Sequence, residues 1–212
     1  KVHSNKIPRI GGIIFFPSVA VAVIVLLFLE NNFSDSPDMV RLTSVIVMVG
    51  VSLIYFIGVV DDIFGLGAKF KFGIQMIAAA VMPACNMCID NLHGLFGIYE
   101  LPLFLAWPIT MFIIMLVVNA MNLIDGIDGL SSSLAVVALV SFTILYVGIG
   151  AYVCGLLSVS LLGSVLVFMR YNVFGDERKN TKVFMGDAGS LILGYAFAVL
   201  FIKYATHFYV SS

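Results

Sequence analysis

The chain has 212 residues, of which 61% are hydrophobic and 11% are charged, with a mean hydropathy of +1.12 and a formal net charge of -1. Soluble domains carry about 25% charged residues, so this composition excludes a single water-soluble core. The nearly balanced charge gives no indication of nucleic-acid binding. The composition predicts an all-α, polytopic membrane protein in which the lipid bilayer covers much of the surface.

About seven transmembrane helices are expected, within one membrane domain over residues 1–212. Each apolar run has close to the roughly 20 residues that cross a bilayer. The stretch 134–169 is too long for one span, and Gly148 and Gly150 mark a predicted turn within it. The seven runs are 13–29, 42–60, 72–89, 101–118, 134–148, 151–169 and 188–206.

The basic residues are distributed unequally between the two sides that seven spans define. One side holds nine of the eleven Lys and Arg residues, whereas the other holds Arg41 and, near a span end, Lys203. By the positive-inside rule, the richer side is predicted to be cytoplasmic. Its basic residues are Lys1, Lys6, Arg9, Lys69, Lys71, Arg170, Arg178, Lys179 and Lys182.

Three acidic motifs also fall on this predicted cytoplasmic side. Asp61 and Asp62 end the second run, the segment NAMNLIDGIDGLSSS occupies 119–133, and Asp187 closes the sequence FMGD. A charged side chain at the bilayer centre costs about 2.5–3.5 kcal/mol on the insertion scale. The five carboxylates of these motifs are therefore expected at the membrane interface or around a water-filled cleft.

The segment 119–133 places Asn119, Asn122, Asp125 and Asp128 three residues apart. Carboxylate and amide oxygens suit a hard cation such as Mg²⁺, and nearby cations can neutralise phosphates. Taken singly, these motifs also fit helix caps, turns, a solvated span end or hydrogen bonds between helices. Their position on one side favours a Mg²⁺–phosphate site. The candidate cations are Arg9, Lys69, Lys71 and Arg178.

Four motifs in this order resemble the polyprenyl-phosphate N-acetylhexosamine-1-phosphate transferase family, also called glycosyltransferase family 4. They are VHSNKIPRIGG (2–12), DDIFGLGAKFKFGIQ (61–75), NAMNLIDGIDGLSSS (119–133) and VFMGDAGSLILGY (183–195). The outer loop NLHGLFGIYELP (91–102) is similar as well. The resemblance covers nearly the whole chain, and it is closer to the GlcNAc-1-phosphate branch than to phospho-MurNAc-pentapeptide translocase, which remains the alternative.

The resemblance implies an integral membrane enzyme of the bacterial inner membrane with its active site facing the cytoplasm. A UDP-N-acetylhexosamine, such as UDP-GlcNAc, would transfer its sugar-1-phosphate to a polyprenyl phosphate, such as undecaprenyl phosphate. UMP would leave, and the lipid-linked sugar would start a cell-wall or other envelope polysaccharide. The resemblance leaves a homodimer open.

The resemblance also implies roles for individual positions. Asn122 and Asp187 would hold Mg²⁺, with Mn²⁺ as an alternative, and Phe184 would stack on uracil. Asp61 and Asp62 would handle the lipid phosphate, one of them as a base, while Asp125 and Asp128 would act beside the nucleotide sugar. Further substrate contacts are assigned to Lys71, Lys69, Asn119 and Arg9, and the loop 8–12 would help to shape the cleft.

The chain departs from the family at its ends. The family's later cytoplasmic loop, rich in His or Arg, has no counterpart before Ser212, and an earlier span is missing before Lys1. We therefore expect a core fragment of a protein with ten or eleven spans, inactive as it stands. Two other classes, an intramembrane aspartyl protease and a transporter, would need acids inside the bilayer, which the placement at span ends disfavours.

Overall fold

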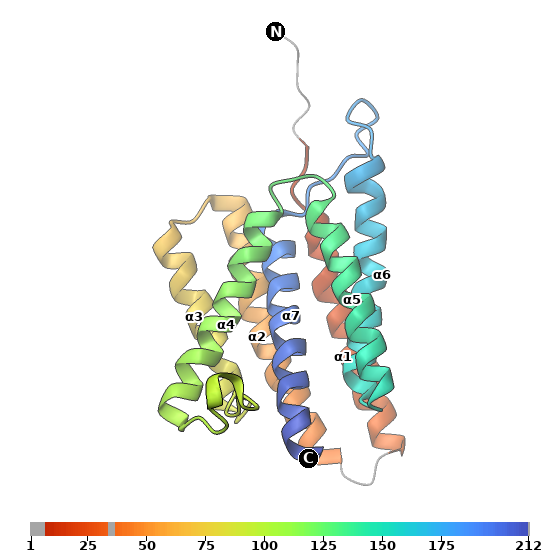
Figure 1. Ribbon diagram of the computed structural model, residues 1–212. Coiled ribbons are helices and arrows are strands. Elements are labelled where there is room, and N and C mark those ends of the chain that lie inside the picture. The colour runs from red at the N-terminus through yellow and green to blue at the C-terminus, as the bar shows by residue number, and fades with distance from the viewer. Residues whose placement is uncertain (1–6, 34–36, 212) are drawn as a thin grey trace.

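The computed structural model describes the backbone of residues 7–33 and 37–211, and the side chains of these residues except 26, 27, 29–33, 37–47 and 207–211. Lys1, Lys6 and the side chain of Arg41, which entered the count of basic residues, lie outside this description. Within the described residues, seven α-helices run alternately up and down (Figure 1). They are α1 (Phe15–Phe33), α2 (Pro37–Phe64), α3 (Ala68–Ala84), α4 (Leu103–Ile124), α5 (Leu130–Gly148), α6 (Tyr152–Phe174) and α7 (Gly186–Ser211).

The predicted all-α membrane bundle is confirmed, including the turn between the fifth and sixth helices, where Gly150 has a φ of 75°. Two 3-10 turns, η1 (Gly11–Ile14) and η2 (Leu95–Gly97), complete the secondary structure of the described residues apart from one isolated β-bridge. Within that part of the chain, four helices are long and apolar enough to cross a membrane. These spans are Leu103–Ile124, Leu130–Gly148, Tyr152–Phe174 and Gly186–Thr206.

Most helix bounds differ by a few residues from the predicted runs, and two of these differences change where polar residues lie. The third run was expected to continue to residue 89, but α3 ends at Ala84 because the chain turns at Asn86, whose φ is 58°. Asparagine accepts this left-handed conformation better than most residues. The fourth run was expected to end at 118, whereas α4 continues to Ile124, so Asn119 and Asn122 lie within its last turns.

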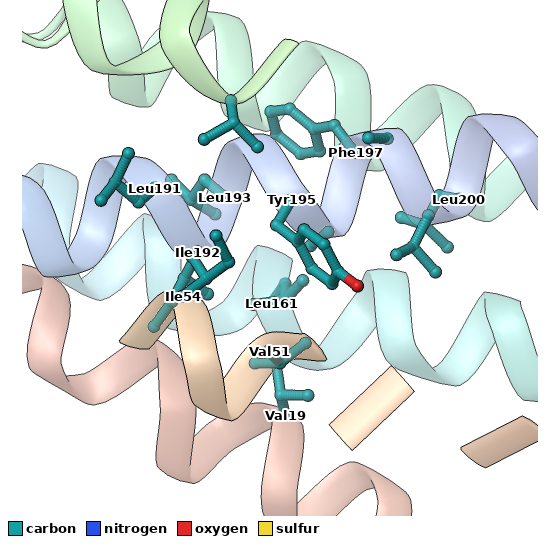
Figure 2. Packing of buried hydrophobic residues seen from close by; sticks show 14 of the residues in the cluster. Val19, Val51, Ile54, Leu161, Leu191, Ile192, Leu193, Tyr195, Phe197 and Leu200 are labelled. Atoms are coloured by element: carbon teal, nitrogen blue, oxygen red, sulfur yellow. The ribbon is translucent and has the colours of Figure 1, made fainter. Parts of the chain in front are cut away.

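Helix α7 forms the centre of the bundle. Its apolar window is 78% buried, compared with 22% for α4, and α7 packs against both α2 and α4. Figure 2 shows Tyr195 of α7 among apolar side chains of neighbouring helices, and its hydroxyl donates to the Ala78 carbonyl oxygen at 3.1 Å. The N-terminus of α7, and with it Asp187, is therefore held in the middle of one end of the bundle.

Glycine allows α7 to approach its neighbours closely. A Cβ added to Gly194 would lie 2.6 Å from the Val118 Cα on α4, and one added to Gly58 on α2 would lie 2.5 Å from the Ala188 Cα. Small residues of this kind permit backbone-to-backbone packing between membrane helices. This packing fixes the distance between the ends of α2, α4 and α7, where the acidic motifs lie.

Candidate functional site

Asp62, the second residue of the Asp61–Asp62 pair, joins the end of α2 to the start of α7. Its carboxylate accepts hydrogen bonds from the backbone N–H groups of Asp187 at 2.8 Å and Ala188 at 3.0 Å. A carboxylate at this position satisfies free N–H groups and complements the positive end of the helix dipole. Gly186, with a φ of 76°, leaves room for it, because an added Cβ would lie 2.7 Å from an Asp62 oxygen.

Lys71 lies between two carboxylates at the same end of the bundle. Its Nζ is 2.7 Å from Asp61 Oδ2 and 3.0 Å from Asp187 Oδ2. The other Asp61 oxygen accepts the Leu66 N–H at 2.7 Å. The side chains of Lys71 and Asp61 are only 15% and 8% exposed, so the cation is held in place at this end of the bundle.

Asn122 connects α4 to α7. Its side-chain amide donates to Asp187 Oδ1, and it also donates to Ser190 Oγ at 2.9 Å. The nitrogen and oxygen of an asparagine amide are assigned from such contacts, and exchanging them would turn the Asn122 oxygen toward Asp187. In that orientation the two oxygens would form a pair of hard donors, which fits Mg²⁺ that keeps waters and phosphate oxygens as its other ligands.

His, Cys, Asp and Glu side chains within the described residues do not form a group of three that could hold a metal by itself. A site built on Asn122 and Asp187 would therefore depend on oxygens from a bound ligand. This is the usual situation for Mg²⁺ at phosphate-binding sites.

The connection between α4 and α5 contributes two more carboxylates. Asp125 accepts a hydrogen bond from Ser131 Oγ at 2.7 Å, and Asp128 forms an ion pair with Lys182 at 2.7 Å. Burial raises the pKa of Asp125 to about 6, the Ser131 hydrogen bond opposes this rise, and the charges of neighbouring carboxylates add to it. Lys182 also lies 5.8 Å from the centre of the Phe184 ring.

The N-terminal arm fixes the loop that carries Phe184. The Phe184 N–H donates to the Pro8 carbonyl at 3.0 Å, and the Gly11 N–H donates back to the Phe184 carbonyl at 3.0 Å. The Gly12 N–H donates to the Met185 carbonyl at 2.8 Å. The arm and the loop thus form one hydrogen-bonded wall.

These elements enclose a cleft of about 310 Å³, within the size range of small-molecule sites. Seven of the predicted site residues line it, together with Gly126 and Gly186: Arg9, Asp62, Asn122, Asp125, Asp128, Phe184 and Asp187. Asp61 and Lys71 are joined to this set through the ion pair with Asp187.

Two predicted residues are not brought to the cleft. Asn119 donates to Gln75 Oε1 at 3.1 Å and to the Met115 carbonyl at 2.8 Å, so it links α4 to α3. Lys69 is exposed at the start of α3. The spacing of three residues places Asn119 and Asn122 near the same face of α4, but this face meets α3 at one residue and α7 at the other.

Sequence reasoning missed Asn172, a buried residue near the end of α6. Its side-chain oxygen accepts the Gly129 N–H at 2.9 Å, and its amide donates to the Val183 carbonyl at 3.0 Å. Asn172 therefore joins the two walls of the cleft. Its occurrence in the apolar run LLGSVLVFMRYNVF was the available signal, because a buried amide in a membrane helix needs partners.

The fold and the site define a class of protein. It is a multi-pass helical membrane protein whose cleft, at one end of the bundle, is surrounded by carboxylates, an amide and a buried lysine. A family profile described as glycosyl transferase family 4 matches residues 44–205. The chain therefore belongs to glycosyl transferase family 4.

Curated relatives of two kinds are similar to this chain. A probable undecaprenyl-phosphate N-acetylglucosaminyl 1-phosphate transferase of Bacillus subtilis is 34% identical over 94% of this chain and 52% of its own length. A phospho-N-acetylmuramoyl-pentapeptide-transferase of Clostridium botulinum is 33% identical over 94% of the chain and 61% of its length. A decaprenyl-phosphate N-acetylglucosaminephosphotransferase of Mycolicibacterium smegmatis is 32% identical, covering 91% and 48%. The chain thus spans about half the length of these relatives.

Proposed function

We propose that this chain is the core of an enzyme that transfers N-acetylhexosamine-1-phosphate, and specifically GlcNAc-1-phosphate, from a UDP-sugar to a polyprenyl phosphate such as undecaprenyl phosphate. Family membership and the names of relatives such as the Bacillus subtilis protein support this reaction. The observation that carries the proposal is Lys71 between Asp61 and Asp187, next to a cleft with Phe184 on its other wall.

The chemistry requires two anionic substrates to approach each other. An oxygen of the lipid phosphate forms a bond to the sugar-linked phosphorus of the UDP-sugar. The bond between that phosphorus and the bridging oxygen breaks, and UMP leaves with the electron pair. One phosphoanhydride replaces another, so charge repulsion, rather than bond energy, is the main obstacle that the site has to overcome.

Lys71 can reduce this repulsion because the two carboxylates hold its ammonium group in position before substrates bind. Arg9 lines the cleft and adds a second cation. Asn122 and Asp187 would hold Mg²⁺, which would supply further charge neutralisation and polarise the attacked phosphorus. Phe184 is available to stack on uracil.

The paired aspartates have different tasks in this account. Asp61 holds Lys71, and Asp62 holds the first turn of α7 and thereby Asp187. Both oxygens of each carboxylate are bonded to such donors, so the role of Asp61 and Asp62 is to position the groups that touch the phosphates. Asp125 lines the cleft with a raised pKa, and it is better placed to exchange a proton with a bound substrate near neutral pH.

We also propose that the end of the bundle with the cleft faces the cytoplasm of a bacterial cell, where UDP-sugars are made. The basic residues Arg9, Lys71, Arg178 and Lys182 belong to this end, which agrees with the positive-inside rule. The lipid substrate would reach the cleft from the bilayer, so the product would be a lipid-linked precursor of a cell-envelope polysaccharide.

Transfer of phospho-MurNAc-pentapeptide is the second candidate, because the Clostridium botulinum relative has that name. The assay that separates the two supplies the purified, intact protein with polyprenyl phosphate, Mg²⁺ and either radiolabelled UDP-GlcNAc or UDP-MurNAc-pentapeptide. We expect labelled lipid and UMP with UDP-GlcNAc. Labelled lipid with the pentapeptide substrate alone would assign the second function, and labelled lipid with neither would reject both.

A further inference from the structure

A short hairpin, residues 89–102, lies at the end of the bundle opposite the cleft, between α3 and α4 (Figure 1). The Leu92 N–H donates to the Tyr99 carbonyl at 2.8 Å, and the Leu101 N–H donates to the Asp90 carbonyl at 2.7 Å. Its base is attached to α4 through the Ile89 N–H, which donates to Thr110 Oγ1 at 2.9 Å. These bonds give the hairpin a defined shape.

The tip of this hairpin presents apolar side chains outward. Phe96 is 90% exposed, and Leu95 and Tyr99 are 57% and 67% exposed. Phe96 has a φ of 56°, a left-handed conformation that bulky residues rarely adopt. The neighbouring Gly97 also has a positive φ. The backbone is thus bent in a way that directs a large aromatic side chain away from the bundle.

The surroundings of the hairpin indicate what covers these side chains. The apolar surface continues into the first turn of α4, where Leu103 and Phe104 are 66% and 74% exposed. Figure 1 shows that the hairpin stays within the length of the bundle and does not project past the far ends of the helices. The α4 span begins at Leu103, directly after the hairpin, so the hairpin lies next to a span end, where membrane proteins are enriched in Trp and Tyr.

The charge of the hairpin also fits burial in lipid by apolar contact. The stretch 72–169 contains no Lys or Arg, and the hairpin carries Asp90 and Glu100. Attraction to anionic headgroups therefore cannot draw the hairpin to the membrane. Exposed aromatic and aliphatic side chains can, because their transfer from water into the interface is favourable whatever the headgroup charge.

We propose that the 89–102 hairpin is a membrane anchor that inserts Phe96 and Leu95 into the lipid leaflet remote from the cleft. Tyr99 would lie at the headgroup level, with its hydroxyl in water. The anchor would hold the ends of α3 and α4 at a fixed depth. Both helices carry residues of the network beside the cleft, namely Lys71 and Asn122.

Tryptophan fluorescence in vesicles tests this proposal without any enzymatic activity. Trp107 is the single tryptophan of the chain, so Phe96→Trp in a Trp107→Phe background reports on the tip alone. The protein is reconstituted in phosphatidylcholine vesicles whose acyl chains carry bromine at a shallow or a deep position. We expect a blue-shifted emission, a strong loss of emission with shallow bromine, a weaker loss with deep bromine, and protection from iodide present on both sides.

Two controls and a second probe complete the experiment. Lys179→Trp, in the exposed loop at the other end, should be quenched by iodide and not by bromine, and Phe112→Trp, 65% exposed in the middle of α4, should respond most to deep bromine. Leu95→Trp repeats the measurement if Phe96→Trp loses its helical circular dichroism. Quenching of the tip by iodide alone would place it in water, and protection from both quenchers would show that protein covers it; either result overturns the proposal.

Discussion

The acidic residues of the cleft differ in how completely their charge is matched. Asp61 and Asp62 each use both oxygens on close donors, from Lys71, Leu66 and the first turn of α7. Asp125 receives one hydrogen bond, from Ser131, and has other carboxylates nearby. The sequence shows three similar aspartates, and the difference follows from burial and partners, which a local motif does not specify.

The raised pKa of Asp125 predicts a measurable pH dependence. Burial destabilises its charged form and raises the pKa from 3.8 to about 6, so the folded protein binds this proton more tightly than the unfolded chain. Its contribution favours folding at low pH, and that contribution is lost as pH rises from about 4 through 6. Asp125→Asn should therefore raise the melting temperature above pH 6 and change it little near pH 4.

The same variant should also change the pH profile of kcat/KM. If Asp125 acts as a carboxylate, activity falls as the pH drops through about 6, and Asp125→Asn removes this acidic limb while lowering kcat. Ser133→Ala, in the first turn of α5, serves as a control. An unchanged limb and an unchanged kcat in Asp125→Asn would show that the proton belongs to another group.

Phe184 carries a separate prediction, about nucleotide binding. Aromatic pairs contribute about 0.5–1.5 kcal/mol beyond buried area, which corresponds to roughly 2- to 12-fold in affinity. If stacking on uracil is equal in the ground and transition states, Phe184→Leu should raise KM for the UDP-sugar by this factor and preserve kcat. Steady-state kinetics with saturating lipid acceptor measure it. An unchanged KM would remove Phe184 from the nucleotide site.

Helix positions were the part of the fold that the sequence predicted best, because runs of about 20 apolar residues have few alternatives. Which helix occupies the centre was not predictable, since apolar side chains suit both lipid and protein neighbours. The α4 window is 22% buried and the α7 window 78%. The contacts of Gly58 and Gly194 distinguish α7, and they become visible only when the partners are known.

Asn172 shows how connections between elements determine the cleft. Replacing it by Leu leaves the Gly129 N–H and the Val183 carbonyl without their partner, and each buried unsatisfied group costs about 1–3 kcal/mol. We expect a lower melting temperature and faster proteolysis of residues 176–182. Ser141→Ala is the matched control, because the Ser141 hydroxyl bonds within its own helix, to the Val137 carbonyl. Equal stability of the two variants would contradict the bridging role.

At the scale of the molecule, the sequence correctly predicted the seven alternating helices of the described residues and the gathering of three distant motifs at one end. It did not separate cleft residues from supporting residues: Asn119 bonds to Gln75, while Asn122 reaches α7.

The sidedness of the molecule remains a prediction. In a background without native cysteines, Lys179→Cys should react with an impermeant maleimide from the cytoplasmic side and Ile149→Cys from the other. Reaction of both from one side would refute the topology.

The central claim is that this cleft moves a sugar-linked phosphate from a nucleotide to a lipid. The most direct measurement follows the two phosphorus atoms of UDP-GlcNAc separately in the intact protein, supplied with polyprenyl phosphate and Mg²⁺. We predict that label in the sugar-linked phosphate appears in the lipid and label in the uridine-linked phosphate appears in UMP. Asp187→Ala should abolish both at unchanged helical content. Uridine-linked label in the lipid, or undiminished transfer by Asp187→Ala, would contradict this account.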